Sequence, residues 1–165
     1  MTGLRESELN LQVALKLRDE LVRRGYAVVL TRENEDTAVS CAERAQIANK
    51  AQADAFLRIH ANDGGGSGAQ TICTTSSNPY TKSVWKNSSR LSEDILDTYC
   101  RVTGIRRQYI WYTDQMTGNN WAGVPTTMIE MGFLSNAGED RWMASAEGQK
   151  KIVKGLADGL DRYFS

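Results

Sequence analysis

The chain has 165 residues, the length of one domain that can bury a sizeable core without disulfides. Twenty Lys and Arg residues balance twenty Asp and Glu residues, so the chain lacks the cationic field that dominates nucleic-acid binding. Apolar residues make up 41% and charged residues 24%, as in ordinary globular proteins, and no apolar run is long enough for a transmembrane helix. We therefore expect no nucleic-acid partner and no membrane span.

The three cysteines, Cys41, Cys73 and Cys100, are far apart and have no CxxC spacing. This arrangement disfavours a disulfide framework and a cysteine-based zinc site, and we interpret all three as small packing residues. The first ten residues, MTGLRESELN, lack the basic segment and apolar core of a secretory signal, so any export signal lies outside this chain or does not exist.

Helical and extended patterns alternate along the first sixty residues. Apolar residues at helical spacing predict a helix over Leu9–Arg24, with acidic residues near its start. The stretch YAVVLTR predicts a buried strand over Tyr26–Arg32, because β-branched and aromatic residues run together there. Ser40 and Glu43 have the spacing of a capping box, which predicts a second helix. The stretch ADAFLRIH predicts a strand that ends at His60.

The same alternation continues to the end of the chain. DGGGSGAQ predicts a flexible turn, and a long helix is expected from near Pro79 through Tyr99. Asn136 begins a closing helical region that reaches Tyr163. Further strands are predicted at QTICTT, QYIWYT and TTMIEMGF. Strands and helices at this spacing predict an α/β fold, a single domain with a twisted, helix-covered and largely parallel sheet.

Two ionisable residues follow apolar runs at the predicted carboxyl ends of strands, where open α/β sheets bind ligands. These residues are His60, the only histidine of the chain, and Glu130. Glu6 lies near the start of the first helix. Each has an ordinary alternative: a hydrogen-bonded strand end for His60, a structural ion pair for Glu130, and a favourable position near the helix dipole for Glu6.

The segments around these three residues resemble the zinc-dependent N-acetylmuramoyl-L-alanine amidases of the amidase_3 family. ESELNLQVALKLRDELVRRGYAVVLTR resembles that family's metal-binding glutamate with the helix and strand that follow. AERAQIANKAQADAFLRIHAND resembles the segment that leads to its ligand histidine. VPTTMIEMGFLSN resembles the strand with its catalytic glutamate, and QKKIVKGLADGLDRYF resembles its closing helix. The resemblance covers essentially the whole chain, so residues 1–165 are expected to form one amidase_3-like catalytic domain.

This resemblance implies that Glu6 and His60 bind Zn²⁺ and that Glu130 is the catalytic carboxylate. Zinc lowers the pKa of a bound water and polarises a scissile carbonyl, and a nearby carboxylate can then transfer the proton. The implied reaction cleaves the amide between N-acetylmuramic acid and the L-alanine of the peptidoglycan stem peptide, as bacterial autolysins do. The implied location is extracellular or in the cell wall.

Three further residues are weaker candidates for substrate contacts. Asn62 stands beside His60, although a turn role is equally compatible with its type. Arg44 could pair with a carboxylate near the site, and its alternative is a solvated helix face. Trp121 could line a substrate groove, and its alternative is a packing anchor.

The chain departs from the family at its beginning. Members start with a strand that ends in an Asp-Pro-Gly-His-Gly-like segment, and neither that segment nor a second histidine is present here. The motifs therefore supply two zinc ligands where a catalytic site expects three, so we expect weak zinc binding by this chain alone. Either the chain is a piece of a longer protein or it is a natural short form. A missing strand would also leave a sheet edge open to pairing with another chain.

Two other functions remain as alternatives. The domain could be a catalytically silent amidase-like module that binds cell-wall fragments or a protein partner. The glycines of DGGGSG could instead form a phosphate-binding loop. The second alternative is weak, because these glycines lead into an extended pattern and not into a helix N-terminus.

Overall fold

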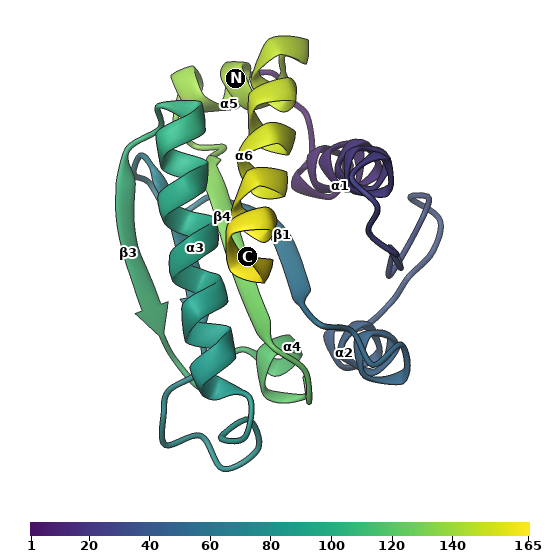
Figure 1. Ribbon diagram of the computed structural model, residues 1–165. Coiled ribbons are helices and arrows are strands. Elements are labelled where there is room, and N and C mark those ends of the chain that lie inside the picture. Colours follow the sequence, from purple (N-terminus) through teal and green to yellow (C-terminus); the bar gives the residue numbers. More distant parts are fainter.

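A computed structural model describes residues 1–165 as one α/β domain (Figure 1). Four strands form a mixed sheet in the order β1-β4-β2-β3. Its strands are β1 (Phe56–Asn62), β2 (Ala69–Cys73), β3 (Arg107–Tyr112) and β4 (Thr126–Phe133). The helices are α1 (Glu6–Arg23), α2 (Cys41–Lys50), α3 (Trp85–Thr103), α4 (Thr117–Asn120), α5 (Ala137–Ala144) and α6 (Ala146–Phe164). The predicted fold class is confirmed.

The pairing of the strands is more mixed than their alternation with helices suggests. Strand β1 pairs with β4 in parallel, and β2 pairs with β3 in parallel. The central pair, β2 with β4, is antiparallel. The sheet therefore consists of two parallel pairs that are joined by the antiparallel pairing of β2 with β4, and β1 and β3 are its edge strands.

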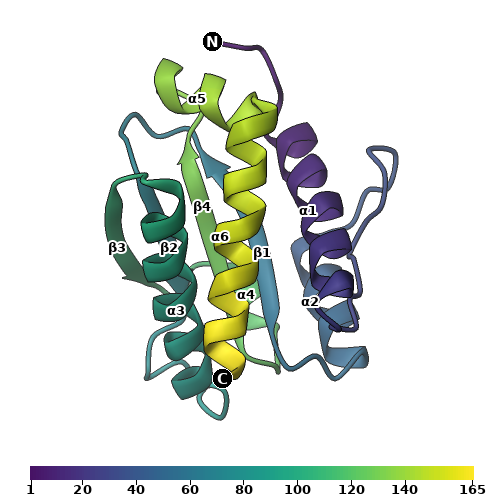
Figure 2. The same cartoon turned by 45° about the horizontal axis from the view of Figure 1, so that its top comes forward.

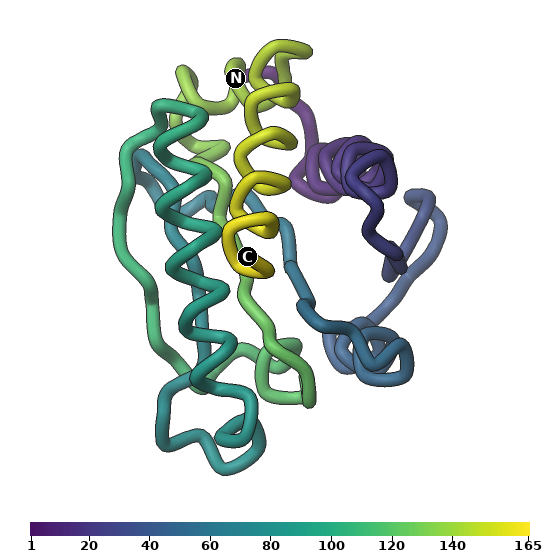
Figure 3. The backbone as a smooth tube through the Cα atoms, in the orientation of Figure 1, coloured from purple at the N-terminus to yellow at the C-terminus, as the bar shows by residue number.

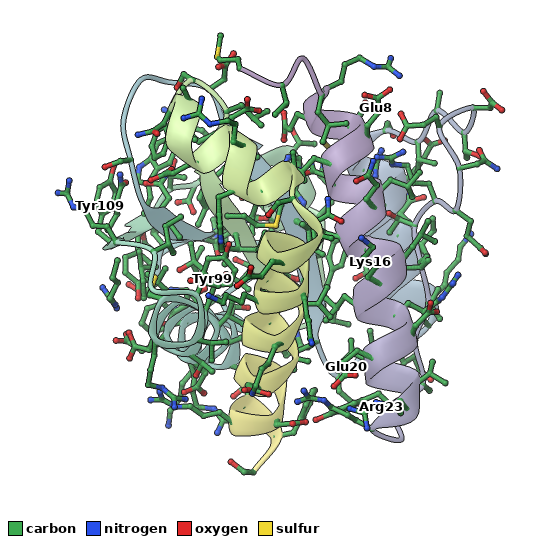
Figure 4. All side chains as sticks on the ribbon, turned by 90° about the horizontal axis from the view of Figure 1, so that it is seen from above. Glu8, Lys16, Glu20, Arg23, Tyr99 and Tyr109 are labelled. Atoms are coloured by element: carbon green, nitrogen blue, oxygen red, sulfur yellow. The ribbon has the colours of Figure 1, made fainter.

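Three long helices cover one face of the sheet and enclose the main core. Helices α3 and α6 lie side by side over the strands, and α1 lies beyond β1 (Figures 1 and 2). Their buried faces meet alternate residues of the strands, such as Ile129 and Met131. Tyr99 is fully buried beneath α6, and its hydroxyl donates to the carbonyl of Met131 at 2.8 Å (Figure 4). This layer leaves the opposite face of the sheet to the functional groups.

The short helices α2 and α4 cover part of that opposite face. A small apolar cluster of Ala45, Ala48, Phe56 and Ala122 holds them against the beginning of β1. Helix α2 begins as predicted, because Ser40 accepts the N–H of Glu43 while the Glu43 carboxylate accepts the N–H of Ser40. The carboxyl end of β1 lies beyond these helices and stays accessible.

The prediction of a strand over Tyr26–Arg32 is wrong for this chain. The segment belongs to no helix or strand, and the tube in Figure 3 passes from α1 to α2 without joining the sheet. A strand requires hydrogen bonds from a neighbour as well as suitable side chains. No strand lies beside Tyr26–Arg32, and the nearest one, β1, pairs only with β4. Composition alone therefore could not produce a strand here.

A network of ion pairs joins the C-terminal ends of α1 and α6. Arg24, just past the end of α1, contacts Glu20 at 2.7 Å, Asp158 at 2.9 Å and Asp161 at 2.5 Å. Its side chain is only 18% exposed. Arg23 also contacts Glu20 but is 71% exposed and reaches no residue of α6. Figure 4 shows Glu20 and Arg23 at this end of α1.

We expect Arg24→Ala to lower the free energy of unfolding by about 1–2 kcal/mol, because it removes a partly buried cation shared by three carboxylates. Arg23→Ala is the matched control and should leave the free energy of unfolding nearly unchanged, since an exposed single pair contributes little. Urea unfolding of both variants measures the difference. Equal effects would contradict this role for Arg24.

Candidate functional site

Strand pairing and helix α1 bring the three principal candidates together. His60 and Glu130 are register partners in the parallel pair of β1 and β4, so their side chains project from the same face of the sheet. Glu6 is the first residue of α1, and its Oε1 lies 2.9 Å from the Nδ1 of His60. The predicted convergence of an imidazole and two carboxylates at the carboxyl end of the strands is therefore present in the structure.

Glu6 is held as a carboxylate at this edge. Its Oε1 accepts the Nδ2 of Asn10 at 3.1 Å and the backbone N–H of Ala61 at 3.3 Å, in addition to its contact with His60. The hydrogen bond to His60 is the largest cause that lowers the pKa of Glu6 below its ordinary value. The side chains of Glu6 and His60 are 42% and 37% exposed, so a ligand can reach this pair from solvent.

Glu130 has the opposite environment. Burial raises the pKa of the Glu130 carboxyl above its ordinary value, and the neighbouring charge of Glu6 raises it further. The neighbouring side chains of His60 and Arg58 act in the other direction without cancelling the effect of burial. Its Oε2 is buried and has no hydrogen-bond partner. Two carboxylates at one edge thus differ in protonation behaviour, as groups with different catalytic roles do.

Arg58 is a site residue that the sequence interpretation missed. It lies two residues before His60 on the same face of β1, is 8% exposed, and donates from Nη1 to the Oδ1 of Asn119 at 2.8 Å. Gly118 packs so closely on the guanidinium that an added Cβ would come within 2.6 Å of Cζ. No carboxylate pairs directly with this buried cation, and its charge acts on Glu130 through space. The sequence does contain a signal for Arg58, because a residue two positions before His60 in a strand lies on the same face of the sheet.

The cysteines divide between two environments. Cys73 and Cys100 are buried, as expected for packing residues. Cys41 is exposed, so its interpretation as a packing residue is wrong. It begins α2, and its Sγ lies 3.7 Å from the Nη2 of Arg58.

The three weaker candidates lie around the cluster without joining it. Asn62 accepts the N–H of Gly64 at 2.8 Å, as a turn residue does. Arg44 is half-buried and donates from Nε to the carbonyl of Val39 at 3.0 Å, with no carboxylate in contact. Trp121 is 56% exposed, and its carbonyl accepts the Nδ2 of Asn49 at 2.9 Å. None of these contacts assigns a substrate role.

The side chains fit two positions of a zinc site. A carboxylate and an imidazole in mutual contact are ligand types that catalytic zinc uses, and Glu6 and His60 provide them. A catalytic site takes three protein ligands, however, and no group of three or more His, Cys, Asp and Glu side chains is placed to share a metal ion. Glu6 and His60 are therefore the residues that could hold a metal.

Comparison with known proteins identifies the family. The α/β fold of this chain is that of known N-acetylmuramoyl-L-alanine amidase structures. Residues 1–162 match the family described as "Amidase_3: N-acetylmuramoyl-L-alanine amidase". The chain belongs to the Amidase_3 family.

Relatives and solved structures agree with this assignment. The chain is 32% identical over 162 residues to the N-acetylmuramoyl-L-alanine amidase LytC of Bacillus subtilis, covering 98% of this chain and 32% of LytC. It is 31% identical over 169 residues to the amidase CwlM of Bacillus licheniformis, covering 99% of this chain and 62% of CwlM. The chain thus spans about a third of LytC. An N-acetylmuramoyl-L-alanine amidase structure from Clostridium difficile 630 superimposes with a TM-score of 0.87 at 26% identity, covering 99% of this chain and 86% of that one.

The coupling between the two carboxylates gives a prediction for metal-free protein. Glu6→Gln removes a like charge and keeps an acceptor for His60, so we expect the pKa of Glu130 to fall. Glu8→Gln is the matched control, because Glu8 lies two residues along α1 and contacts Arg5 instead. Carbon-13 NMR titration of the glutamate carboxyls measures the pKa of Glu130 in both variants. An unchanged pKa of Glu130 in Glu6→Gln would contradict the coupling.

Proposed function

We propose that this domain cleaves peptidoglycan at the amide between N-acetylmuramic acid and the L-alanine of the stem peptide. One observation carries the proposal: the half-buried side chain of Glu130, whose Oε2 is buried without a hydrogen-bond partner, stands beside the Glu6–His60 pair. Membership of the Amidase_3 family supports the substrate and the bond. A buried carboxyl oxygen without a partner is costly for the fold, and such groups cluster at functional sites.

The chain's own residues have distinct roles in this proposal. Glu6 and His60 would hold Zn²⁺, which when bound supplies a Lewis acid and lowers the pKa of water. Glu130, with its raised pKa, would accept a proton from the attacking water and deliver it to the departing amine of alanine. Arg58 would position the Glu130 carboxylate electrostatically from the same face of the sheet.

A second candidate function is a catalytically silent domain that binds cell-wall fragments or a protein partner. It is the alternative because no group of three or more His, Cys, Asp and Glu side chains is placed to share a metal ion. A related structure, the CwlD amidase from Clostridioides difficile, is described in complex with the GerS lipoprotein. That relative lends some support to a protein partner.

We also propose that the domain acts outside the cell or in the cell wall, where its substrate lies. No helix of the structure has the length and apolarity needed to cross a membrane. The direct test of location is fractionation of cells that produce the complete protein, with detection in the wall fraction as the expected result. Its recovery only from the cytoplasm would contradict this location.

Glu130→Gln tests the catalytic role. With purified peptidoglycan and saturating Zn²⁺, we expect the release of free amino termini by the unaltered chain and a loss of about a hundredfold or more in Glu130→Gln, because an amide cannot accept the proton. Glu147→Gln, at an 81% exposed position on α6, is the matched control and should retain full activity.

The melting temperature of Glu130→Gln distinguishes a loss of catalysis from a loss of folding. Because the folded-state pKa of Glu130 is raised, its carboxyl favours the fold at low pH, and this contribution is lost as the pH rises through that pKa. Glu130→Gln should therefore keep or raise the melting temperature at pH 7. Equal activity of Glu130→Gln and the unaltered chain would overturn the role of Glu130. No release by a folded, zinc-saturated chain would favour the silent alternative.

A further inference from the structure

The face of the sheet that carries His60 and Glu130 continues past the candidate site onto strands β2 and β3. Gln70 of β2 is a register partner of Glu130, as His60 is on the other side, so all three side chains project from one face. The next residue of β2 agrees with this placement, because the hydroxyl of Thr71 donates to the carbonyl of Ser92 in α3, on the opposite face. Gln70 is therefore the neighbour of Glu130 on the side away from β1.

The side chain of Gln70 has polar atoms that the fold itself does not use. The residue is only 5% exposed, and its side-chain amide makes no hydrogen bond with any other residue. The Oε2 of Glu130 beside it is also buried without a partner. Leaving such groups unpaired costs free energy, and a few polar groups that converge on one place commonly fix the orientation of a ligand there. Two neighbouring strands thus present unpartnered polar groups on the same face.

Aromatic side chains extend this face to the edge of the sheet at β3. Strand β3 pairs with β2 so that Trp111 lies beside Ile72. Ile110 packs against the main core, so its neighbours Tyr109 and Trp111 project from the other face of the sheet. Both aromatic side chains are exposed. Figure 4 shows Tyr109 at the side of the molecule away from α1.

A third aromatic residue of β3 belongs to the opposite face. Tyr112 follows Trp111, and its hydroxyl is hydrogen-bonded to the Oγ of Ser89 in α3 at 2.9 Å. Its side chain therefore lies on the helix side of the sheet, as the alternation of a strand requires. The aromatic residues of this one strand thus divide between the two faces, and Tyr109 and Trp111 are those on the face of the candidate site.

The surface between Glu130 and the outer edge of β3 is formed by uncharged side chains. They come from three neighbouring strands and are Gln70, Ile72, Met128, Tyr109 and Trp111. Exposed apolar groups that adjoin a functional site mark a binding surface. Aromatic rings with an amide among them suit a ligand that has apolar faces and a polar rim. A pyranose ring with an acetamido group is such a ligand, because C–H bonds form its faces and its polar groups lie around its rim.

We propose that Gln70, Tyr109 and Trp111 form a sugar platform that binds the glycan strand of peptidoglycan next to the scissile amide. This inference rests on the proposed function, which supplies the substrate. Tyr109 and Trp111 stack on the C–H faces of the N-acetylated sugars, and the Gln70 amide donates to an acetamido carbonyl. The stem peptide carries carboxylates, whereas a glycan with amide-linked lactyl groups is uncharged. The uncharged platform therefore selects the glycan over the peptide.

Binding of a neutral oligosaccharide tests the sugar platform without hydrolysis. The probe is a tetrasaccharide of alternating N-acetylglucosamine and N-acetylmuramic acid whose lactyl groups are capped as methylamides, used without added Zn²⁺. We expect saturable binding that shifts the indole N–H signal of Trp111 in nitrogen-15 NMR. Tyr109→Ala should weaken binding at least tenfold, and Gln70→Met about fivefold, because it removes a hydrogen bond at similar volume. Tyr112→Ala, from the opposite face of the same strand, is the matched control and should leave the affinity within twofold.

The peptide L-alanyl-γ-D-glutamyl-L-lysine is the competing ligand and should leave the Trp111 signal of the unaltered chain unchanged. No binding of the tetrasaccharide, a shift of Trp111 by the peptide instead, or equal losses of affinity in Tyr109→Ala and Tyr112→Ala would overturn the sugar platform. The comparison of the two ligands uses the unaltered chain, so it stands even if a variant fails to fold. Tetrasaccharide binding without release of amino termini from peptidoglycan would contradict the proposed reaction alone, and release without tetrasaccharide binding would contradict the platform alone.

Discussion

The parallel register between β1 and β4 is the constraint on which the site depends. It places His60 beside Glu130 at the end of the sheet where ligands bind in open α/β folds. Glu6, the first residue of helix α1, reaches the same edge of the sheet. Its carboxylate is held there by contacts with His60 and with the backbone N–H of Ala61. A slip of one residue in this register would send His60 and Glu130 to opposite faces of the sheet.

The site combines a stabilised carboxylate with a destabilised one. Glu6 has three hydrogen-bonding neighbours and a lowered pKa, whereas Glu130 is half-buried, has a buried oxygen without a partner and has a raised pKa. A fold that keeps Glu130 in this state gives up some stability, which is common where a carboxyl must exchange protons. Arg58 reduces that cost without contacting the carboxylate, because its charge is held by Asn119 and the packing of Gly118.

Local patterns predicted those parts of the structure that local interactions decide. The Ser40–Glu43 capping box and the strand over residues 126–133 follow from nearby residues, as does the place of His60 near the end of β1, which continues two residues further than predicted, to Asn62. The prediction of a strand over Tyr26–Arg32 was wrong because a strand needs a hydrogen-bonded neighbour, and no strand of the sheet pairs with this segment. The antiparallel pairing of β2 with β4 also depends on chain path, which periodicity does not report.

In the candidate site, too, nearby residues predict one part and only the folded chain shows the rest. Family-like flanks around Glu6, His60 and Glu130 predicted which residues converge, but distances and burial needed the folded chain. Arg58 was missed because an arginine in an apolar strand is ordinarily read as a surface residue, and its burial arises from α4, which is distant in the sequence. From the single histidine the sequence predicts two zinc ligands, Glu6 and His60, and this ligand set stays a prediction.

We propose that Glu6 and His60 form the metal-binding pair beside Glu130. Anomalous X-ray diffraction at the zinc edge, on crystals soaked in saturating Zn²⁺, is the direct test of this pair. We expect an anomalous peak in contact with Glu6 and His60 that disappears in His60→Ala. A zinc peak bound elsewhere, or no peak at this pair in a well-ordered crystal, would contradict it.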